Sequence, residues 1–233
     1  MILSVRLKTV AVILSVICFL SCIRLVANAV TAASARPNDF RIVIDAGHGG
    51  IDGGAVGTGG VKESDLNLLV AYDVKECFEN AGFKVVMTRR DENGLYGIAT
   101  DGFKRRDMNK RKEIINEASP VAVVSIHMNK SPVKSRRGAQ VCCQEGDSDS
   151  LTLANVIQSN LNEYLNTTYT GRGYDIIEGD YYICDCSPYP SVIVECGFLS
   201  NAEDERLLET SEYRRKLAYL IYCGVAEYVA IYT

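Results

Sequence analysis

The stretch RIVIDAGHGG at residues 41–50 decides the fold, because it is a short apolar strand that ends in a glycine-flanked histidine. A second stretch, VAVVSIH at residues 121–127, repeats this pattern, and His48 and His127 are the two histidines of the chain. Continuous β-branched runs of this length are typical of strands buried on both faces of a parallel sheet. Ligands bind beyond the carboxyl ends of such strands, so we expect the two imidazoles to converge. Two unrelated, hydrogen-bonded histidines are the alternative.

Strands and helices alternate along the rest of the chain. Apolar runs predict strands at residues 41–45, 83–88, 121–127, 138–144, 181–184 and 192–195. Apolar stripes at helical spacing predict helices at residues 64–80, 105–117, 150–166 and 211–228. This alternation predicts a single α/β domain with a mostly parallel, mixed sheet of about six strands and helices on both faces.

The first 35 residues differ from the rest. Arg6 and Lys8 precede an apolar run at residues 10–20, and small-residue sites follow at residues 27–29 and 33–35. This order is typical of a secretory signal peptide, or of an N-terminal membrane anchor when it is not cleaved. We expect residues 1–35 to direct export to the cell envelope or the extracellular space, residues 36–40 to form a linker, and residues 41–230 to form the functional domain.

Composition excludes some classes of function. The chain has 233 residues and a net charge of -4, and no basic stripe runs along it, which argues against nucleic acid as a partner. Seven of the nine cysteines follow the N-terminal segment, and several lie in apolar runs, where cysteine acts as a small hydrophobic residue. A scaffold built on disulfides is not expected at this length.

Two histidines need a third ligand to hold a catalytic zinc ion, which keeps three protein ligands and one open position. The acidic candidates near His48 are Asp45, Asp52, Glu63 and Asp65. Asp45 could instead orient an imidazole from its own strand. Glu63 is modestly favoured over Asp52, because the glycine-rich loop can fold back and present it. The alternative for Glu63 is a carboxylate that stabilises the start of a helix through the helix dipole.

Glu195 ends the apolar run at residues 191–194, where a charged group is costly unless it is paired or used. A carboxylate at the end of a strand, opposite two histidines at strand ends, is well placed for proton transfer. The alternative is a buried salt bridge with Arg172 or Arg206.

Four blocks of sequence now form a recognisable pattern: IDAGHGG at 44–50, ESDLNL at 63–68, residues 111–116 ahead of SIHMN at 125–129, and ECGFLSN at 195–201. In this order, across about residues 41–228, they resemble the zinc-dependent N-acetylmuramoyl-L-alanine amidases of the amidase-3 family. The resemblance implies one Zn²⁺ ion per chain, a catalytic glutamate, and residues that support the ligands or the substrate. In that order the implied residues are His48, Glu63 and His127 for the metal, Glu195 for catalysis, and Asp45, Asn129 and Arg111 for support.

The resemblance also implies a substrate, peptidoglycan, cut between the lactyl group of muramic acid and L-alanine. A short, exported, single-domain form is similar to the sporulation-type members, which trim spore-cortex peptidoglycan so that muramic lactam can form. We therefore expect a location in the spore envelope, and a partner protein that activates or targets the enzyme. Three rival hypotheses are a zinc peptidase acting on wall peptides, a non-catalytic module that binds wall or a partner, and a cysteine hydrolase using Cys196 with His127.

Overall fold

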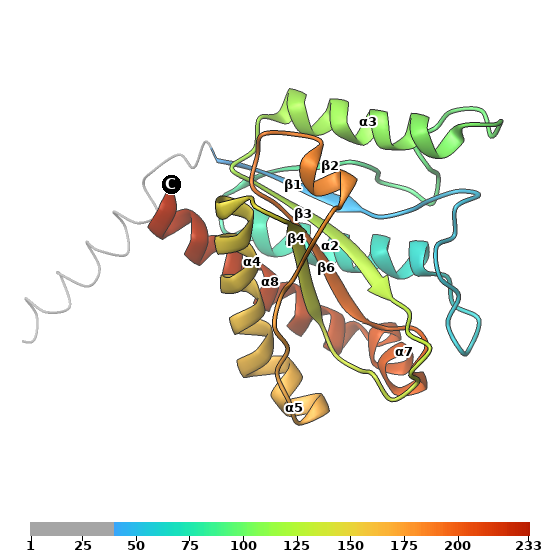
Figure 1. Ribbon diagram of the computed structural model, residues 1–233, viewed down its shortest axis with the longest axis vertical. Helices are drawn as coiled ribbons and strands as arrows, with labels where there is room; N and C mark the ends of the chain where they lie inside the picture. The colour runs from blue at the N-terminus through green and yellow to red at the C-terminus, as the bar shows by residue number, and fades with distance from the viewer. Residues whose placement is uncertain (1–39) are drawn as a thin grey trace, which may run out of the picture. The chain divides into compact units, whose positions relative to one another are not determined.

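Six strands form one sheet in the order β2-β1-β3-β6-β4-β5 (Figure 1). The structure is a computed structural model that describes residues 40–233. Neighbouring strands run parallel except for β4 and β6, which are antiparallel. The strands are β1 (Arg41–Ala46), β2 (Lys84–Met87), β3 (Ala122–Asn129), β4 (Gln140–Gln144), β5 (Ile177–Gly179) and β6 (Ser191–Phe198).

The expected signal peptide or membrane anchor at residues 1–35 lies outside the described residues, as does most of the expected linker at 36–40. Within residues 40–233, none of the helices has the length and the apolar character needed to cross a bilayer.

Helices cover both faces of the sheet (Figure 1). One face is covered by α2 (Glu63–Asn80), α4 (Ser148–Leu161) and α8 (Ser211–Tyr232), whose apolar side chains share one core with the sheet. The other face is covered by α3 (Phe103–Ala118) and by the short α6 (Tyr182–Asp185), over a smaller core. The helical segments η1 (Asn162–Asn166), α5 (Thr167–Thr170) and α7 (Ala202–Glu209) complete the domain. The predicted α/β architecture with a mixed sheet is confirmed.

The alternation of side chains along each strand sorts residues between the two faces. In β1, Ile42 and Ile44 join the core under α2 and α8, whereas Val43 joins the core under α3. The same alternation places Asp45 on the α3 side, where the buried Arg111 of α3 reaches it. In β6, Ile193 lines the α3 side, so Glu195, two residues later, faces that side as well.

The structure differs from the sequence-based expectation around residues 177–184. The predicted strand at 181–184 is wrong, since Tyr182–Asp185 forms the helical turn α6, and the strand at this edge is β5 at Ile177–Gly179. The amide groups of Cys184 and Asp185 both donate to the carbonyl of Tyr181, which closes the turn. This turn buries Ile183 and Cys184 in the smaller core, and that tertiary contact overrides the strand preference of the YYIC run.

The order of strands creates a place for a site. From β1 the chain crosses over to β2 on one side, and the next strand, β3, pairs with β1 on its other side. Crossovers that diverge in this way leave a crevice at the carboxyl ends of the two strands. In this protein the crevice lies between β1 and β3.

Candidate active site

Three neighbouring parallel strands bring the predicted site residues to one edge of the sheet. His48 follows β1, His127 lies near the end of β3, and Glu195 lies in β6. His127 and Glu195 are direct register partners in the β3–β6 pair, so their side chains emerge side by side. Glu63 is the first residue of α2, the helix that crosses over from β1 to β2. Chain positions as far apart as 48 and 195 therefore meet because of strand order.

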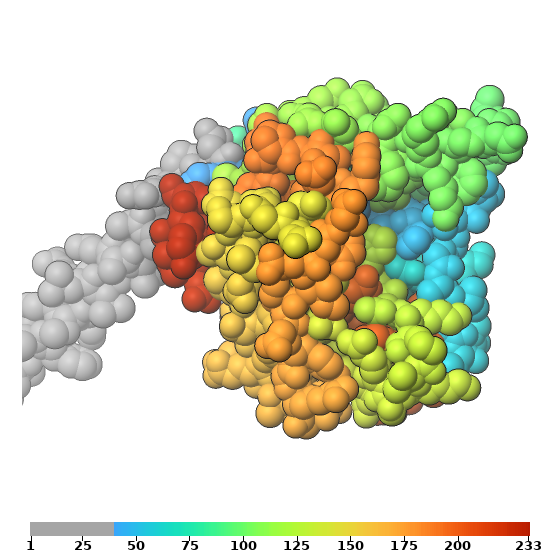
Figure 2. All heavy atoms as spheres, viewed as in Figure 1, coloured from blue at the N-terminus to red at the C-terminus, as the bar shows by residue number. Residues whose placement is uncertain are grey.

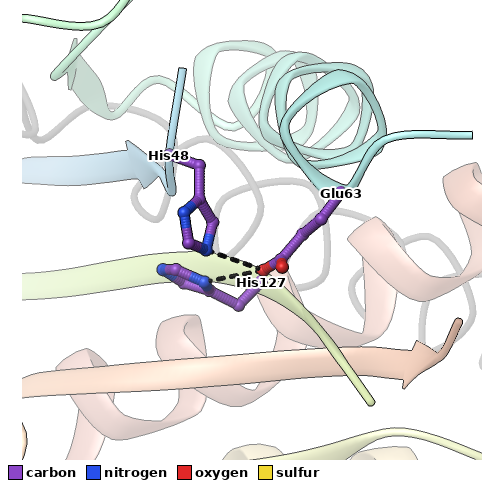
Figure 3. Close-up of side chains that lie close together, drawn as sticks. All are labelled: His48, Glu63 and His127. Atoms are coloured by element: carbon purple, nitrogen blue, oxygen red, sulfur yellow. Dashed lines mark hydrogen bonds and ion pairs between the residues drawn. The ribbon is translucent and has the colours of Figure 1, made fainter. Parts of the chain in front are cut away.

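His48, Glu63 and His127 converge on one point (Figure 3). The Nε2 atom of His48 lies 3.2 Å from Oε1 of Glu63, and the Nδ1 atom of His127 lies 2.9 Å from the same oxygen. One possible ligand atom from each residue lies within 4.8 Å of the others. Two imidazole nitrogens and a carboxylate oxygen thus face a common centre, and this cluster suits a metal ion.

Backbone groups fix the Glu63 carboxylate in place. The amide of Ala55 donates to Oε2 at 2.8 Å, and the amide of Met128 donates to Oε1 at 3.2 Å. The first bond ties the glycine-rich loop back onto the helix start, as the sequence suggested. Asp52, the weighed alternative to Glu63, contacts Nδ1 of His48 instead, at 3.1 Å.

Glycines make room for the imidazoles. A β-carbon at Gly47 would lie 2.2 Å from Nε2 of His127, so no other residue fits there without displacing that ring. Gly54 has a φ of +67°, and a β-carbon there would lie 2.5 Å from Oε2 of Glu63. His48 itself has a φ of 61°, a left-handed conformation that costs energy in a non-glycine residue. The surrounding structure must therefore hold the His48 turn.

Two buried arginines hold this turn through its backbone carbonyls. Arg111 donates to the carbonyls of Ala46 and His48, at 2.8 and 2.6 Å. Arg89 donates to the carbonyls of Ala46 and Gly47 at 2.8 and 3.0 Å, and to the carbonyl of Ser64 at 2.8 Å. Arg89 therefore connects the His48 turn with the start of α2.

Asp45 does not take the imidazole-orienting role that the sequence suggested for it. Its buried carboxylate accepts hydrogen bonds from Thr88, Ser125 and Arg111, and Asp52 is the acid that contacts an imidazole. Asn129 contributes its backbone carbonyl, which accepts a hydrogen bond from the amide of Leu199 at 2.8 Å.

The electrostatics of the cluster favour a positive charge at its centre. Burial opposes protonation of His48, but hydrogen bonds and charge from Glu63 and Asp52 outweigh it and raise the pKa of His48. Burial alone would raise the pKa of Glu63, but hydrogen bonds from His127 and His48 lower it far below its usual value. Glu63 therefore stays ionised and provides the negative charge that attracts a cation.

Glu195 lies beside the cluster without belonging to it. Its Oε2 atom is buried and has no hydrogen-bond partner within residues 40–233. Burial raises the pKa of Glu195, and the nearby Glu63 raises it further, while His127 lowers it. The salt bridges considered for Glu195 are not formed, since Arg206 pairs with Glu203 and Arg172 lies over the ring of Tyr174. A carboxylate with a buried, unpaired oxygen atom and a raised pKa is typical of a general acid or base.

The cysteine hypothesis finds no support in the structure. Cys196 is fully buried, and burial together with Glu195 raises the pKa of its thiol well above the usual value. A nucleophilic cysteine needs the opposite environment, one that stabilises the thiolate. The seven cysteines of the described part of the chain are all free.

A cavity of about 300 Å³ opens onto the two imidazoles from the side of α3 and α6. Its walls include Tyr96, Phe103, Tyr181 and Tyr182, and its floor includes Asp45 and Ile193 of the sheet. Figure 2 shows the surface hollowed where the orange segment around α6, the green α3 region and the blue stretch after β1 meet. A substrate can therefore reach the cluster from this face.

One signal in the sequence would have identified the arginine contacts, and only in part. Arg89 follows an apolar strand directly, as Glu195 does, and a charge in that position needs a partner. Its partners, however, are backbone carbonyls on other segments, which no pattern in the sequence specifies. Sequence reasoning therefore missed Arg89, and it named Arg111 without its role.

Known proteins resemble this chain in both sequence and structure. Residues 42–227 match the family described as N-acetylmuramoyl-L-alanine amidase. The germination-specific N-acetylmuramoyl-L-alanine amidase of Bacillus subtilis is 36% identical over 191 residues, which cover 80% of this chain and 78% of that protein. The structure of the CwlD amidase from Clostridioides difficile, solved in complex with the GerS lipoprotein, has a TM-score of 0.77 and 33% identity, covering 83% of this chain and all of that one. An N-acetylmuramoyl-L-alanine amidase from Clostridium difficile 630 has a TM-score of 0.72 and 27% identity, covering 84% of this chain and 100% of that one.

Proposed function

This chain belongs to the N-acetylmuramoyl-L-alanine amidase family, and from that premise we propose how its own residues carry out the reaction. The enzyme hydrolyses the amide bond between the lactyl group of muramic acid and L-alanine in peptidoglycan. The observation that carries the proposal is the convergence of His48, Glu63 and His127, with the unpaired carboxylate of Glu195 beside them.

We assign the metal as zinc, held by Nε2 of His48, Nδ1 of His127 and the Glu63 carboxylate. Two imidazoles and one carboxylate are a common donor set of catalytic zinc sites. Asp52 fits this assignment, because an acceptor 3.1 Å from Nδ1 of His48 keeps the proton on that nitrogen and leaves Nε2 free. When bound, zinc supplies Lewis acidity, which polarises an amide carbonyl and makes water a stronger nucleophile near neutral pH.

Glu195 moves the protons. In its ionised form, the carboxylate accepts a proton from the attacking water, and the buried position that raises its pKa makes it a stronger base. In its protonated form, the same group donates to the departing nitrogen of L-alanine, so that the peptide leaves as a neutral amine. Register pairing with His127 keeps Glu195 beside the ligand set without using its oxygens as ligands.

We further propose that the substrate is spore-cortex peptidoglycan and that the enzyme acts in the spore envelope after export. The similarity to a germination-specific amidase supports this assignment. The muramic acid left on the glycan, with its lactyl group free, would then be converted to muramic lactam. A similar amidase forms a complex with a lipoprotein, which supports a partner protein that activates or positions this enzyme. If the N-terminal segment is not cleaved, it would hold the enzyme at the membrane.

The proposal is tested by comparing two variants with the wild type. Glu195→Gln keeps its shape and loses the acid–base group, so we expect normal zinc content and a fall in kcat of about 10²- to 10⁴-fold. His48→Ala removes a ligand, so we expect both zinc and activity to be lost. Metal analysis and digestion of purified sacculi measure both quantities, and Glu178→Gln, an exposed acid on β5, serves as the control.

Mass spectrometry of the released products decides between the amidase and a zinc peptidase. Intact peptides that begin with L-alanine, together with free lactyl groups on the sugar, are expected. Peptides cut inside the stem would replace this assignment with the peptidase. A wild-type protein that binds zinc and sacculi but releases nothing would point to the non-catalytic module.

A further inference from the structure

A second cavity, of about 260 Å³, lies at the same edge of the sheet as the metal cluster. Its walls continue three segments of the active site. Residues 56–58 precede Glu63, residues 130–134 follow His127, and residues 199–200 follow Glu195. Three residues of chain span at most about 10 Å, so Lys130 lies within that reach of His127. The cluster residues and the lining of the second cavity therefore lie on the same three segments of the chain.

The second cavity is positively charged. Lys130 donates from Nζ to the carbonyl of Val56 at 3.1 Å, and Lys134 is exposed on the same loop. Neither ammonium group forms an ion pair with a carboxylate anywhere in residues 40–233. By contrast, the next cation along the chain that pairs, Arg137, lies 3.2 Å from Asp204. Lys130 and Lys134 thus present positive charge that the protein does not neutralise.

The first cavity has a different chemistry. Its walls carry four aromatic rings, of which Tyr96 and Phe103 pack edge to face at 5.3 Å and Tyr182 is 48% exposed. The cations among its lining residues are matched by acids, since Arg111 pairs with Asp45 and Asp107, and Lys104 lies 3.5 Å from Asp52. Asp180 adds an acid to the same wall. Aromatic faces with acidic neighbours suit an uncharged ligand with apolar C–H faces, such as a sugar, and repel an anion.

We propose that peptidoglycan crosses the metal cluster in one direction, with the muramoyl sugar in the aromatic cavity and the stem peptide over Lys130 and Lys134. This inference rests on the proposed function. The scissile amide joins an uncharged sugar to a peptide that carries free carboxylates, so the two sides of the substrate differ in charge as the two cavities do. The ammonium groups bind the α-carboxylate of the second residue of the stem, which lies about 7 Å from the scissile bond in an extended peptide.

The experiment uses soluble substrates that differ at one end only. One pair is N-acetylmuramoyl-L-alanyl-D-isoglutamate with its γ-carboxyl group blocked as a methylamide, and the matching isoglutamine compound, in which the α-carboxylate is replaced by an amide. A second pair carries the same peptide on one sugar or on a longer glycan. The variants are the double change Lys130→Gln/Lys134→Gln and Tyr182→Ala. Their matched controls are Lys112→Gln, an exposed lysine outside both cavities, and Tyr219→Ala, an exposed tyrosine on α8.

We expect the wild type to have a lower KM for the isoglutamate substrate than for the amide. The double lysine change should raise KM for the isoglutamate substrate about three- to tenfold, with kcat nearly unchanged, and abolish the discrimination. Tyr182→Ala should raise KM for the longer glycan and leave the discrimination between acid and amide intact. Zinc content and thermal melting confirm that each variant is folded and loaded.

Titration calorimetry of the same substrates with the Glu195→Gln enzyme gives binding without turnover, and the lysine changes in that background should weaken binding of the acid alone. Equal effects on acid and amide, or no effect, would reject the lysine subsite. Lysine changes that alter the glycan preference, with Tyr182→Ala altering the acid preference, would reverse the direction. A wild type that holds zinc but cleaves none of the four substrates would instead overturn the proposed function.

Discussion

Arg89 donates hydrogen bonds to four backbone carbonyls, and three of them belong to the two segments that carry His48 and Glu63. A planar guanidinium can reach several acceptors at fixed angles, whereas a lysine is a single point of charge on a flexible stem. The side chain is buried, so a carbonyl that loses its donor cannot turn to water. The proposed metal ligands therefore depend on a residue that is not itself one of the cluster.

We expect Arg89→Lys to weaken zinc affinity about tenfold and to lower the melting temperature. The positive charge remains, but lysine lacks the planar guanidinium that reaches several carbonyls at once. Competition with a chromophoric chelator measures the affinity without reference to activity. The control is Arg90→Lys at the adjacent, exposed position. Equal zinc affinity in Arg89→Lys and wild type would mean that other contacts suffice to hold the His48 turn.

At this scale the sequence predicts which side chains can act, but not which contacts support them. Strand-end histidines and Glu195 could be identified because a polar group after an apolar run is costly. Asp45 and Asp52 could not be told apart, since both lie within four residues of His48. The bridge between Gly49 and Asp52 folds the turn back on itself, and this places Asp52 against the imidazole.

Among the elements, the short helix α7 holds the loop that precedes Glu63. Its buried Glu205 accepts two contacts from the amide of Gly59, at 2.9 and 2.8 Å, and one from the hydroxyl of Thr58. A β-carbon at Gly57 would lie 2.1 Å from the same carboxylate, so the loop packs directly against it. Through these contacts α7 holds the loop that leads into Glu63.

We expect Glu205→Ala to lower the free energy of unfolding by about 1–3 kcal/mol, because the amide of Gly59 and the hydroxyl of Thr58 lose their charged acceptor. Hydrogen exchange at the amide of Gly59 should become faster than in the wild type. Glu209→Ala, an exposed glutamate on the same helix, is the control and should change neither quantity. Unchanged exchange at Gly59 would show that the loop is held by its own turn.

Elements with a clear apolar run were predicted well, and short ones were not. The runs that form β1, β3 and β6 are continuous and β-branched, which leaves little choice of structure. A strand was predicted at residues 181–184, but α6 forms there and the strand β5 lies a few residues earlier. Four residues rich in tyrosine fit either a strand or a helical turn. The contacts with the smaller core decide between them, and they come from residues distant in sequence.

On the scale of the whole molecule, a buried charge network links the sheet with α3. Asp45 pairs with Arg111, which also pairs with Asp107 at 2.6 Å. Burial raises the pKa of Asp45, but the charge of Arg111 and the hydrogen bonds from Ser125 and Thr88 outweigh it and lower the pKa to about 2. A lowered pKa in the folded state stabilises the fold wherever the carboxylate is ionised.

We therefore expect this network to contribute stability above about pH 4, and to lose it as the pH falls through about 2. The contribution of Asp45 is about 2 kcal/mol, from the size of the shift. Urea unfolding between pH 2 and 5 measures it, and Ser125→Ala, which removes one donor to Asp45, should flatten the acid-side slope. An unchanged slope in that variant would assign the acid sensitivity to other carboxylates.

The separation of the site residues along the chain has one more consequence. His48 and Glu195 meet only after β1, β3 and β6 have paired, and the pairing of β3 with β6 joins parts of the chain more than sixty residues apart. A nascent or unfolded polypeptide contains all the site residues but lacks the paired strands that bring them together. Hydrolytic activity therefore appears only when the sheet has formed. Before it folds, the chain cannot hydrolyse anything in the compartments through which it travels.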